Sequence, residues 1–218
     1  MLRTVSIVPA ILTDNKQDFR KQVEKINVFT RRVQIDVSDG EFTPVNTLDI
    51  TNVWWPNNWE TDLHLMAVRP SEHLDTILKL HPSLCILHAE AAENLLPIFA
   101  QLKDAGIKTG IAFMRSTYPP NFKAYIDVAD HALIFAGELN GQGGRADLMQ
   151  MEKIPLIRNM KPEIEIGWDG GADLTNIRAL AHADLDIINV GTAIATAKDP
   201  EAIFKTFVAE IDKNGVII

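Results

Sequence analysis

The chain has a single cysteine and no long apolar run, and each absence limits what the protein can be. One thiol, Cys85, cannot build a disulfide framework or a cysteine-based zinc motif within a chain, and its apolar neighbours favour a core position. No stretch approaches the ~20 apolar residues of a membrane-spanning helix, and the N-terminus lacks the apolar region and cleavage site of a signal peptide. We therefore expect a cytoplasmic protein that does not interact with a membrane.

Positive charge is also scarce, because 21 Lys and Arg residues stand against 29 Asp and Glu residues, for a net charge of −8. Without a basic stripe to neutralise phosphates, nucleic acid is not an expected partner. No Ser-, Gly- or Pro-rich linker divides the 218 residues, and 46% of them are hydrophobic. That content is ample for a large core, so we expect one domain over residues 1–218.

What the sequence does contain is a regular alternation of short β-type runs and helical patterns. Strands are predicted at residues 6–11, 33–37, 62–66, 84–88, 109–113, 132–136, 164–168 and 187–190. The last helix has the clearest signals, because Asp199 is a good N-cap and Pro200 suits the first helical position. Its apolar stripe comprises Ile203, Phe204, Phe207, Val208 and Ile211. The other predicted N-caps are Asp14, Ser71 and Asp173.

The second of these units departs from the pattern. After Thr47 the connection is too short for a full helix, and Pro56 interrupts it. Three tryptophans fall in this segment, and we expect them to pack around a short helix rather than to form a ligand lid or subunit contact: Trp54, Trp55 and Trp59.

The spacing of the strands predicts the fold class. Eight units in 218 residues give about 27 residues each, which suits repeated βα units. The runs CILHA and ALIFA are apolar almost throughout, as in parallel strands that are covered on both faces. We therefore predict a single-domain (β/α)8 TIM barrel. A doubly wound open sheet is the alternative, and it is weakened because no GxGxxG follows the first predicted strand.

Polar side chains lie near the carboxyl ends of several predicted strands, which is where a barrel carries its active site. Asp36 lies in a strand that is otherwise apolar, and Gln34 shares its face. His64 lies in the third strand, and Asp169 follows the seventh. Taken singly, His64 is more often a core histidine and Asp169 a turn residue. Together they predict a shared partner, either a metal ion or a substrate. We interpret His88, at the end of the fourth strand, as structural.

Three glycine-rich stretches are candidates for holding phosphate. They are GQGGR at residues 141–145, Gly170-Gly171 and Gly191-Thr192, which follow the sixth, seventh and eighth predicted strands. Glycine allows the backbone to approach an anion closely, and the last two loops of a barrel are a frequent phosphate position. A single glycine turn is common and weak evidence. Three of them after three successive strands are a more specific indication of a phosphate site.

The sequence resembles the ribulose-phosphate 3-epimerase family over its whole length. The segments that carry the resemblance are SIVPAIL, IDVSDGEFTP, DLHLM, HAEA, GQGGR, WDGG and VGTAI, in the family's order and spacing. The related decarboxylase and hexulose-phosphate synthase group has Asp-x-Lys-x-x-Asp on an equivalent strand. Here that strand reads Asp36-Val37-Ser38-Asp39, and the absence of lysine disfavours that chemistry.

The resemblance implies an isomerase acting on a sugar phosphate, of the type that converts ribulose 5-phosphate to xylulose 5-phosphate. Asp36 and Asp169 would exchange the proton beside the carbonyl through a metal-stabilised enediolate. A divalent Zn, Mn or Mg ion would be held by Asp36, His64 and Asp169, with Gln34 at the place of a fourth ligand. Contacts to the substrate and its phosphate would come from His64, Met66, Gly143, Gly144, Arg145, Gly170, Gly171, Gly191 and Thr192. The family also implies a homo-oligomer.

Several positions depart from the family. Gln34 replaces a histidine ligand, and an amide oxygen suits Mg²⁺ or Mn²⁺ better than Zn²⁺. Ala10, Ser38 and Ala136 replace a serine and two methionines, while Arg115 and Arg145 add charge at the expected mouth. These changes leave two alternatives open. One is an epimerase for another substrate, such as a hexulose phosphate or a sugar acid phosphate, with Arg115 meeting an added charge. The other is a sugar-phosphate-binding barrel that has lost turnover.

Overall fold

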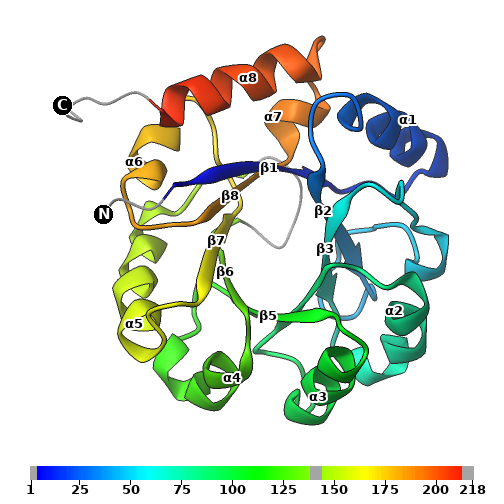
Figure 1. Ribbon diagram of the computed structural model, residues 1–218, viewed down its shortest axis with the longest axis vertical. Helices are drawn as coiled ribbons and strands as arrows, with labels where there is room; N and C mark the ends of the chain where they lie inside the picture. Colours follow the sequence, from blue (N-terminus) through cyan, green and yellow to red (C-terminus); the bar gives the residue numbers. More distant parts are fainter. Residues whose placement is uncertain (1–3, 138–143, 213–218) are drawn as a thin grey trace.

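Eight parallel strands close into a barrel in which each strand pairs with the next and β8 pairs with β1. The computed structural model describes residues 4–137 and 144–212. Figure 1 looks into the barrel, with the helices arranged around the strands. The (β/α)8 prediction is confirmed. The strands are β1 Ser6–Ile11, β2 Arg32–Ser38, β3 Glu60–Met66, β4 Leu84–His88, β5 Lys108–Phe113, β6 His131–Phe135, β7 Glu165–Asp169 and β8 Ile187–Val190.

The helices cover the outside of the barrel. The α-helices are α1 Lys16–Ile26, α2 Leu74–Leu80, α3 Leu96–Asp104, α4 Lys123–Val128, α5 Lys153–Met160, α6 Ile177–Ala181, α7 Thr192–Ala195 and α8 Pro200–Ile211. Four 3-10 turns accompany them: η1 Ile50–Asn52, η2 Pro70–His73, η3 Pro119–Phe122 and η4 Leu148–Glu152. Between β2 and β3 the described helical structure is η1 alone, as the broken second unit predicts. Of the helices in the described ranges, none has the length and apolar character that a membrane crossing requires.

The core has two layers, because strand side chains alternate between the barrel interior and the surrounding helices. Inside the barrel, a small apolar cluster comprises Leu84, Ile86, Ala112 and Leu133. Outside it, a much larger cluster packs strands against helices and includes Cys85. Burial raises the pKa of the Cys85 thiol to about 12, which agrees with its predicted core position.

The N-caps were predicted less accurately than the strands. Asp199 caps α8 as expected, and its carboxylate accepts from the backbone N–H of Ala202. The cap of α1 is Asn15 rather than Asp14, because the Asn15 side chain accepts from the first free N–H groups. Ser71 lies within η2, where its hydroxyl donates to a glutamate. Asp173 accepts backbone N–H groups in the turn that precedes α6, and the residue before that helix is Asn176.

The tryptophans after β2 differ in burial. Trp59 is 6% exposed and belongs to the outer core, and its indole N–H donates to Asn27 Oδ1 at 2.9 Å. Trp55 packs against the same core, whereas Trp54 is 45% exposed and meets the Phe19 ring edge-on. Core packing is therefore confirmed for Trp59 and Trp55.

Candidate active site

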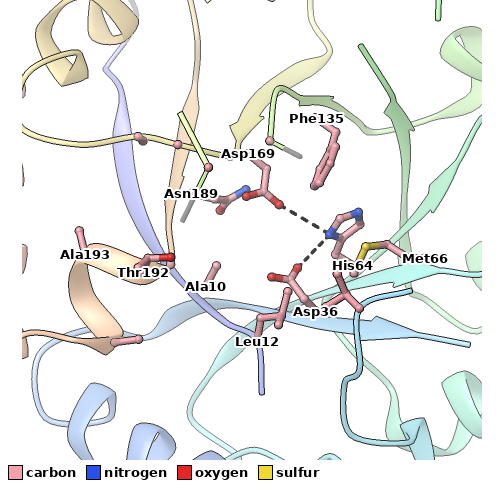
Figure 2. A pocket seen from close by; sticks show the side chains of 18 of the residues that line it. Ala10, Leu12, Asp36, His64, Met66, Phe135, Asp169, Asn189, Thr192 and Ala193 are labelled. Carbon is pink, nitrogen blue, oxygen red and sulfur yellow. Dashed lines mark hydrogen bonds and ion pairs between the residues drawn. The ribbon is translucent and has the colours of Figure 1, made fainter. Parts of the chain in front are cut away.

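A cavity of about 280 Å³ opens at the carboxyl ends of the strands. Its walls come from β1, β2, β3, β6, β7 and β8 and from the loops that follow them. Figure 2 shows Asp36, His64 and Asp169 directed toward one another, with Met66 and Phe135 beside the imidazole. The polar residues that end the predicted strands thus meet in one place, as barrel topology requires.

The centre of this site is one imidazole between two carboxylates. His64 Nδ1 lies 2.9 Å from Asp36 Oδ1 and 3.6 Å from Asp169 Oδ2. Strand register brings the first pair together, because Asp36 and His64 are directly opposite each other on β2 and β3. All three side chains are buried. Two like charges in a buried pocket repel, so the site favours retaining a proton or a cation between them.

The ionisation of the site reflects that repulsion. Burial, together with the charge of Asp36, raises the pKa of Asp169 to about 6. Burial lowers the pKa of His64, but the hydrogen bond to Asp36 and the charges of both carboxylates outweigh it and raise the pKa above its ordinary value. A carboxyl group that titrates near neutral pH can act as an acid or as a base there.

Gln34 lies beneath the two carboxylates and joins them. Its amide nitrogen donates to Asp36 Oδ1 and to Asp169 Oδ2, each at 2.8 Å. Its oxygen accepts from the amide nitrogen of Asn189 at 2.7 Å. Gln34 therefore presents hydrogen-bond donors to the site. Asn189 was not predicted from the sequence, although it is the one polar residue in the apolar strand β8. Among the described residues, the Asn189 Oδ1 atom is buried and has no hydrogen-bond partner.

The site can hold a divalent cation. One ligand atom from each of Asp36, His64 and Asp169 lies within 4.8 Å of the others. Two carboxylate oxygens and an imidazole nitrogen are donors that Zn²⁺ and Mn²⁺ accept, and the oxygens suit Mg²⁺. Three of the four predicted ligands thus converge. The fourth predicted ligand, Gln34, directs its amide nitrogen toward the carboxylates. Its amide would have to rotate by about 180° before the oxygen could coordinate an ion.

On its far side His64 contacts a second imidazole. His64 Nε2 lies 2.8 Å from His88 Nε2, and His88 Nδ1 lies 3.2 Å from Glu90 Oε2. From the sequence, His88 was predicted to be structural, and no role was predicted for Glu90. Both histidines are buried.

The glycines after β6 and β7 let two loops meet at the cavity. Gly170 has φ +110°, and a Cβ there would lie 2.1 Å from the backbone nitrogen of Gly137. Gly171 has φ +70°, and a Cβ there would lie 2.0 Å from the nitrogen of Ala146. Side chains at these positions would force the loops apart.

Most of the predicted phosphate and substrate residues border this cavity, namely Met66, Gly144, Gly170, Gly171, Gly191 and Thr192. Arg145 is exposed and is absent from the cavity wall as described, while Gly143 lies outside the described residues. Arg115 is engaged with the backbone, because its Nε and Nη2 donate to the Ala136 carbonyl at 3.0 and 2.7 Å. It links the loops after β5 and β6.

A (β/α)8 barrel whose ionisable side chains gather at the carboxyl ends of its strands belongs to the class of barrel enzymes. Comparison of the sequence with protein families makes this specific: the model of the ribulose-phosphate 3 epimerase family matches residues 6–195. The chain belongs to this family, and with it to the isomerases that act on carbohydrate phosphates. The resemblance found in the sequence is confirmed.

Relatives agree with this placement, and solved structures share the fold. The chain is 26% identical to ribulose-phosphate 3-epimerase of Schizosaccharomyces pombe over 90% of each chain. It is 31% identical to that of Chlamydia muridarum over 72% of each. The fold is similar to 3-hexulose-6-phosphate synthase from Salmonella typhimurium, with a TM-score of 0.69, 14% identity and coverage of 95% and 98% of the two chains. The 3-keto-L-gulonate-6-phosphate decarboxylase from Vibrio cholerae gives a TM-score of 0.68, 14% identity and coverage of 95% and 97%.

Proposed function

We propose that the protein epimerises a phosphorylated ketose by exchanging the proton on the carbon next to the carbonyl. The observation that carries the proposal is the pair of buried carboxylates, Asp36 and Asp169, which line the cavity and share contacts with one imidazole. One carboxylate removes the proton from one face of the carbon and leaves an enediolate. The other carboxyl group returns a proton to the opposite face, which inverts the centre.

The surroundings of the pair support this division of labour. Burial and the charge of Asp36 raise the pKa of Asp169 to about 6, so one of the two groups can hold a proton while the other is ionised. Gln34 donates to both carboxylates and fixes their separation. A divalent cation held by Asp36, His64 and Asp169 would polarise the substrate oxygens and stabilise negative charge on them. Zn²⁺, Mn²⁺ and Mg²⁺ are the ions to test.

We assign the phosphate group to the loops after β6, β7 and β8. Gly144, Gly170, Gly171, Gly191 and Thr192 border the cavity on that side, and glycine allows the backbone to approach an anion closely. Gly143 and Arg145 complete the set that the sequence predicts. Ribulose 5-phosphate is the first substrate to test. A hexulose phosphate or a sugar acid phosphate, the alternative that the departures from the family left open, is the second.

The test is proton NMR of ribulose 5-phosphate in D₂O with chelator-treated protein, with and without Zn²⁺, Mn²⁺ or Mg²⁺. We expect deuterium at C3 and formation of xylulose 5-phosphate. Asp36→Asn or Asp169→Asn should slow the exchange by about 10²- to 10⁴-fold, because each removes a proton carrier. If neither variant slows exchange, the assignment is wrong. Binding without exchange for any of the three sugar phosphates would support the inactive barrel instead.

A further inference from the structure

The side chain of Arg115 joins two parts of the chain at the mouth of the barrel through their backbone carbonyl groups. Its Nε and Nη2 donate to the Ala136 carbonyl at 3.0 and 2.7 Å, and Nη2 also donates to the Arg145 carbonyl at 3.4 Å. Ala136 directly follows β6, and Arg145 precedes η4. A guanidinium presents its donors in a rigid fork, so these bonds fix the direction of the contact as well as its length.

The loop that carries Arg115 is itself held by two charged side chains. The buried ammonium of Lys153 donates to the backbone carbonyl groups of Met114 and Arg115, the second at 3.1 Å. Glu90 Oε1 accepts from the backbone N–H of Met114 at 2.9 Å. Displacement of this loop would leave a buried charge without its hydrogen-bond partners, which is costly. Arg115 therefore extends from a fixed stretch of backbone.

The backbone that Arg115 holds packs against the end of β7 and the glycines that follow it. The Ala136 N–H donates to the Asp169 carbonyl at 2.7 Å, so both backbone polar groups of Ala136 are bonded. A Cβ at Gly171 would lie 2.5 Å from the carbonyl carbon of Arg145, the same group that Arg115 contacts. Gly171 borders the cavity. The position of this backbone therefore determines the shape of the cavity on the side to which the phosphate is assigned.

We propose that Arg115 is a positioning residue for phosphate binding, which holds the backbone at Ala136 and Arg145 against the loop after β7. It acts through these two carbonyl groups and not through its charge on the ligand. The proposal rests on the proposed function, because it uses the assignment of the phosphate to these loops. It differs from the sequence-based alternative in which Arg115 meets an added charge on the substrate. The two give opposite expectations for a lysine at this position.

The test compares Arg115→Met, which removes the hydrogen bonds and the charge, with Arg115→Lys, which retains the charge but not the fork of donors. Binding of inorganic phosphate to chelator-treated protein is measured by ³¹P NMR titration. We expect both variants to bind phosphate about tenfold or more weakly, because losing one hydrogen bond to a charged group has an effect of this size. Zn²⁺ should bind both variants nearly as it binds the native chain in calorimetric titration, since the Arg115 side chain bonds backbone carbonyl groups rather than the predicted metal ligands.

The matched control is Ser116→Ala, which changes an exposed side chain next to Arg115 in the same loop and should bind both ions as the native chain does. Native phosphate affinity in Arg115→Lys overturns the proposal, because charge alone would then be sufficient. Unchanged affinity in both variants, no phosphate binding by the native chain, or an equal loss of Zn²⁺ binding overturns it as well. Neither titration needs turnover, so an absence of proton exchange would leave this result standing and would count only against the proposed function.

Discussion

The two ends of the barrel hold polar clusters of similar composition that differ in how their negative charge is compensated. Each contains two carboxylates and a histidine within the ring of strands. We define the mouth cluster as Asp36, His64 and Asp169, and the base cluster as Arg32, Asp62, His131 and Glu165. The base cluster includes a guanidinium, and Arg32 donates to Asp62 at 2.9 Å and to Glu165 at 2.8 and 2.6 Å. Among the described residues, no lysine or arginine side chain bonds the mouth carboxylates.

Glu165 at the base and Asp169 at the mouth respond in opposite directions, whereas burial raises the pKa of Asp62 even beside Arg32. Burial raises the pKa of Glu165, but hydrogen bonds from Arg32 and His131 outweigh it and hold the pKa below the ordinary value. Asp169 lacks such a partner, so burial and the charge of Asp36 raise its pKa to about 6. At the base, Glu165 is therefore compensated by Arg32 and His131. The mouth cluster retains repulsion that a proton, a cation or a substrate can relieve, as expected at the catalytic end of this fold.

Removing a carboxylate from the base tests the compensated cluster. Glu165→Gln leaves Arg32 and His131 without their shared anion, and we expect the free energy of unfolding to fall by about 2 kcal/mol, discounted because Glu165 is partly exposed. Proton exchange at the mouth should continue. Urea unfolding measures the free energy of unfolding, and the D₂O assay measures proton exchange.

The pH dependence of that loss has a defined sign. The folded pKa of Glu165 is below its unfolded value, so its contribution is present above the unfolded pKa and disappears as pH falls through the folded pKa. The native chain should lose more stability on acidification than Glu165→Gln does. Glu163→Gln, at an exposed carboxylate, is the control and should follow the native curve. Parallel curves for Glu165→Gln and the native chain would show that the base cluster does not stabilise the fold.

The accuracy of the predictions made from the sequence also differs between parts of the molecule. The strands at 6–11, 84–88 and 187–190 were predicted with their observed bounds, because apolar runs end at clear breaks. The convergence of Asp36, His64 and Asp169 followed from the rule that parallel strands of a barrel end at one mouth. The N-cap of α1 was missed because Asp14 and Asn15 are adjacent and Asp and Asn cap equally well. At α6, Asp173 accepts backbone N–H groups in a turn, and the helix begins only after Asn176, whose side chain makes no cap hydrogen bond.

Side-chain pairing at the site was not accessible in the same way. That Gln34 joins both carboxylates depends on which end of its amide faces them, and Asn189 determines this from a strand distant in sequence. The contact between His64 and His88 depends on the register of β3 and β4, where His64 lies opposite Ile86 rather than opposite His88. Patterns of residue type contain neither the register nor the orientation.

A histidine at position 34 would add a metal ligand to the mouth cluster, which the base cluster does not need. Gln34→His replaces the amide that joins the carboxylates with an imidazole at the fourth position. We expect Zn²⁺ to bind at least about tenfold more tightly, because a nitrogen ligand replaces a donor group that cannot coordinate in its present orientation. Calorimetric titration of chelator-treated protein measures this change.

Gln34→Leu is the matched control, because it removes the amide without adding a ligand. It should not reproduce the tenfold gain. Equal gains in both variants would mean that the amide only obstructs the ion, and that a histidine at this position contributes no coordination.

The last prediction concerns Asp169, where a variant should separate the stability of the fold from its function. Its folded pKa of about 6 lies above the ordinary value of 3.8, so the folded state binds more protons in that window and loses stability as pH rises through it. Asp169→Asn is uncharged throughout and should avoid the loss. In urea unfolding of chelator-treated protein, the variant should gain about 2 kcal/mol on the native chain between about pH 4 and pH 7, while it loses proton exchange. Asp14→Asn, at an exposed carboxylate, should show no such gain. If the stability of Asp169→Asn relative to the native chain does not increase as pH rises, the charges of the mouth carboxylates are compensated within the site. The contrast between the two ends of the barrel would then not hold.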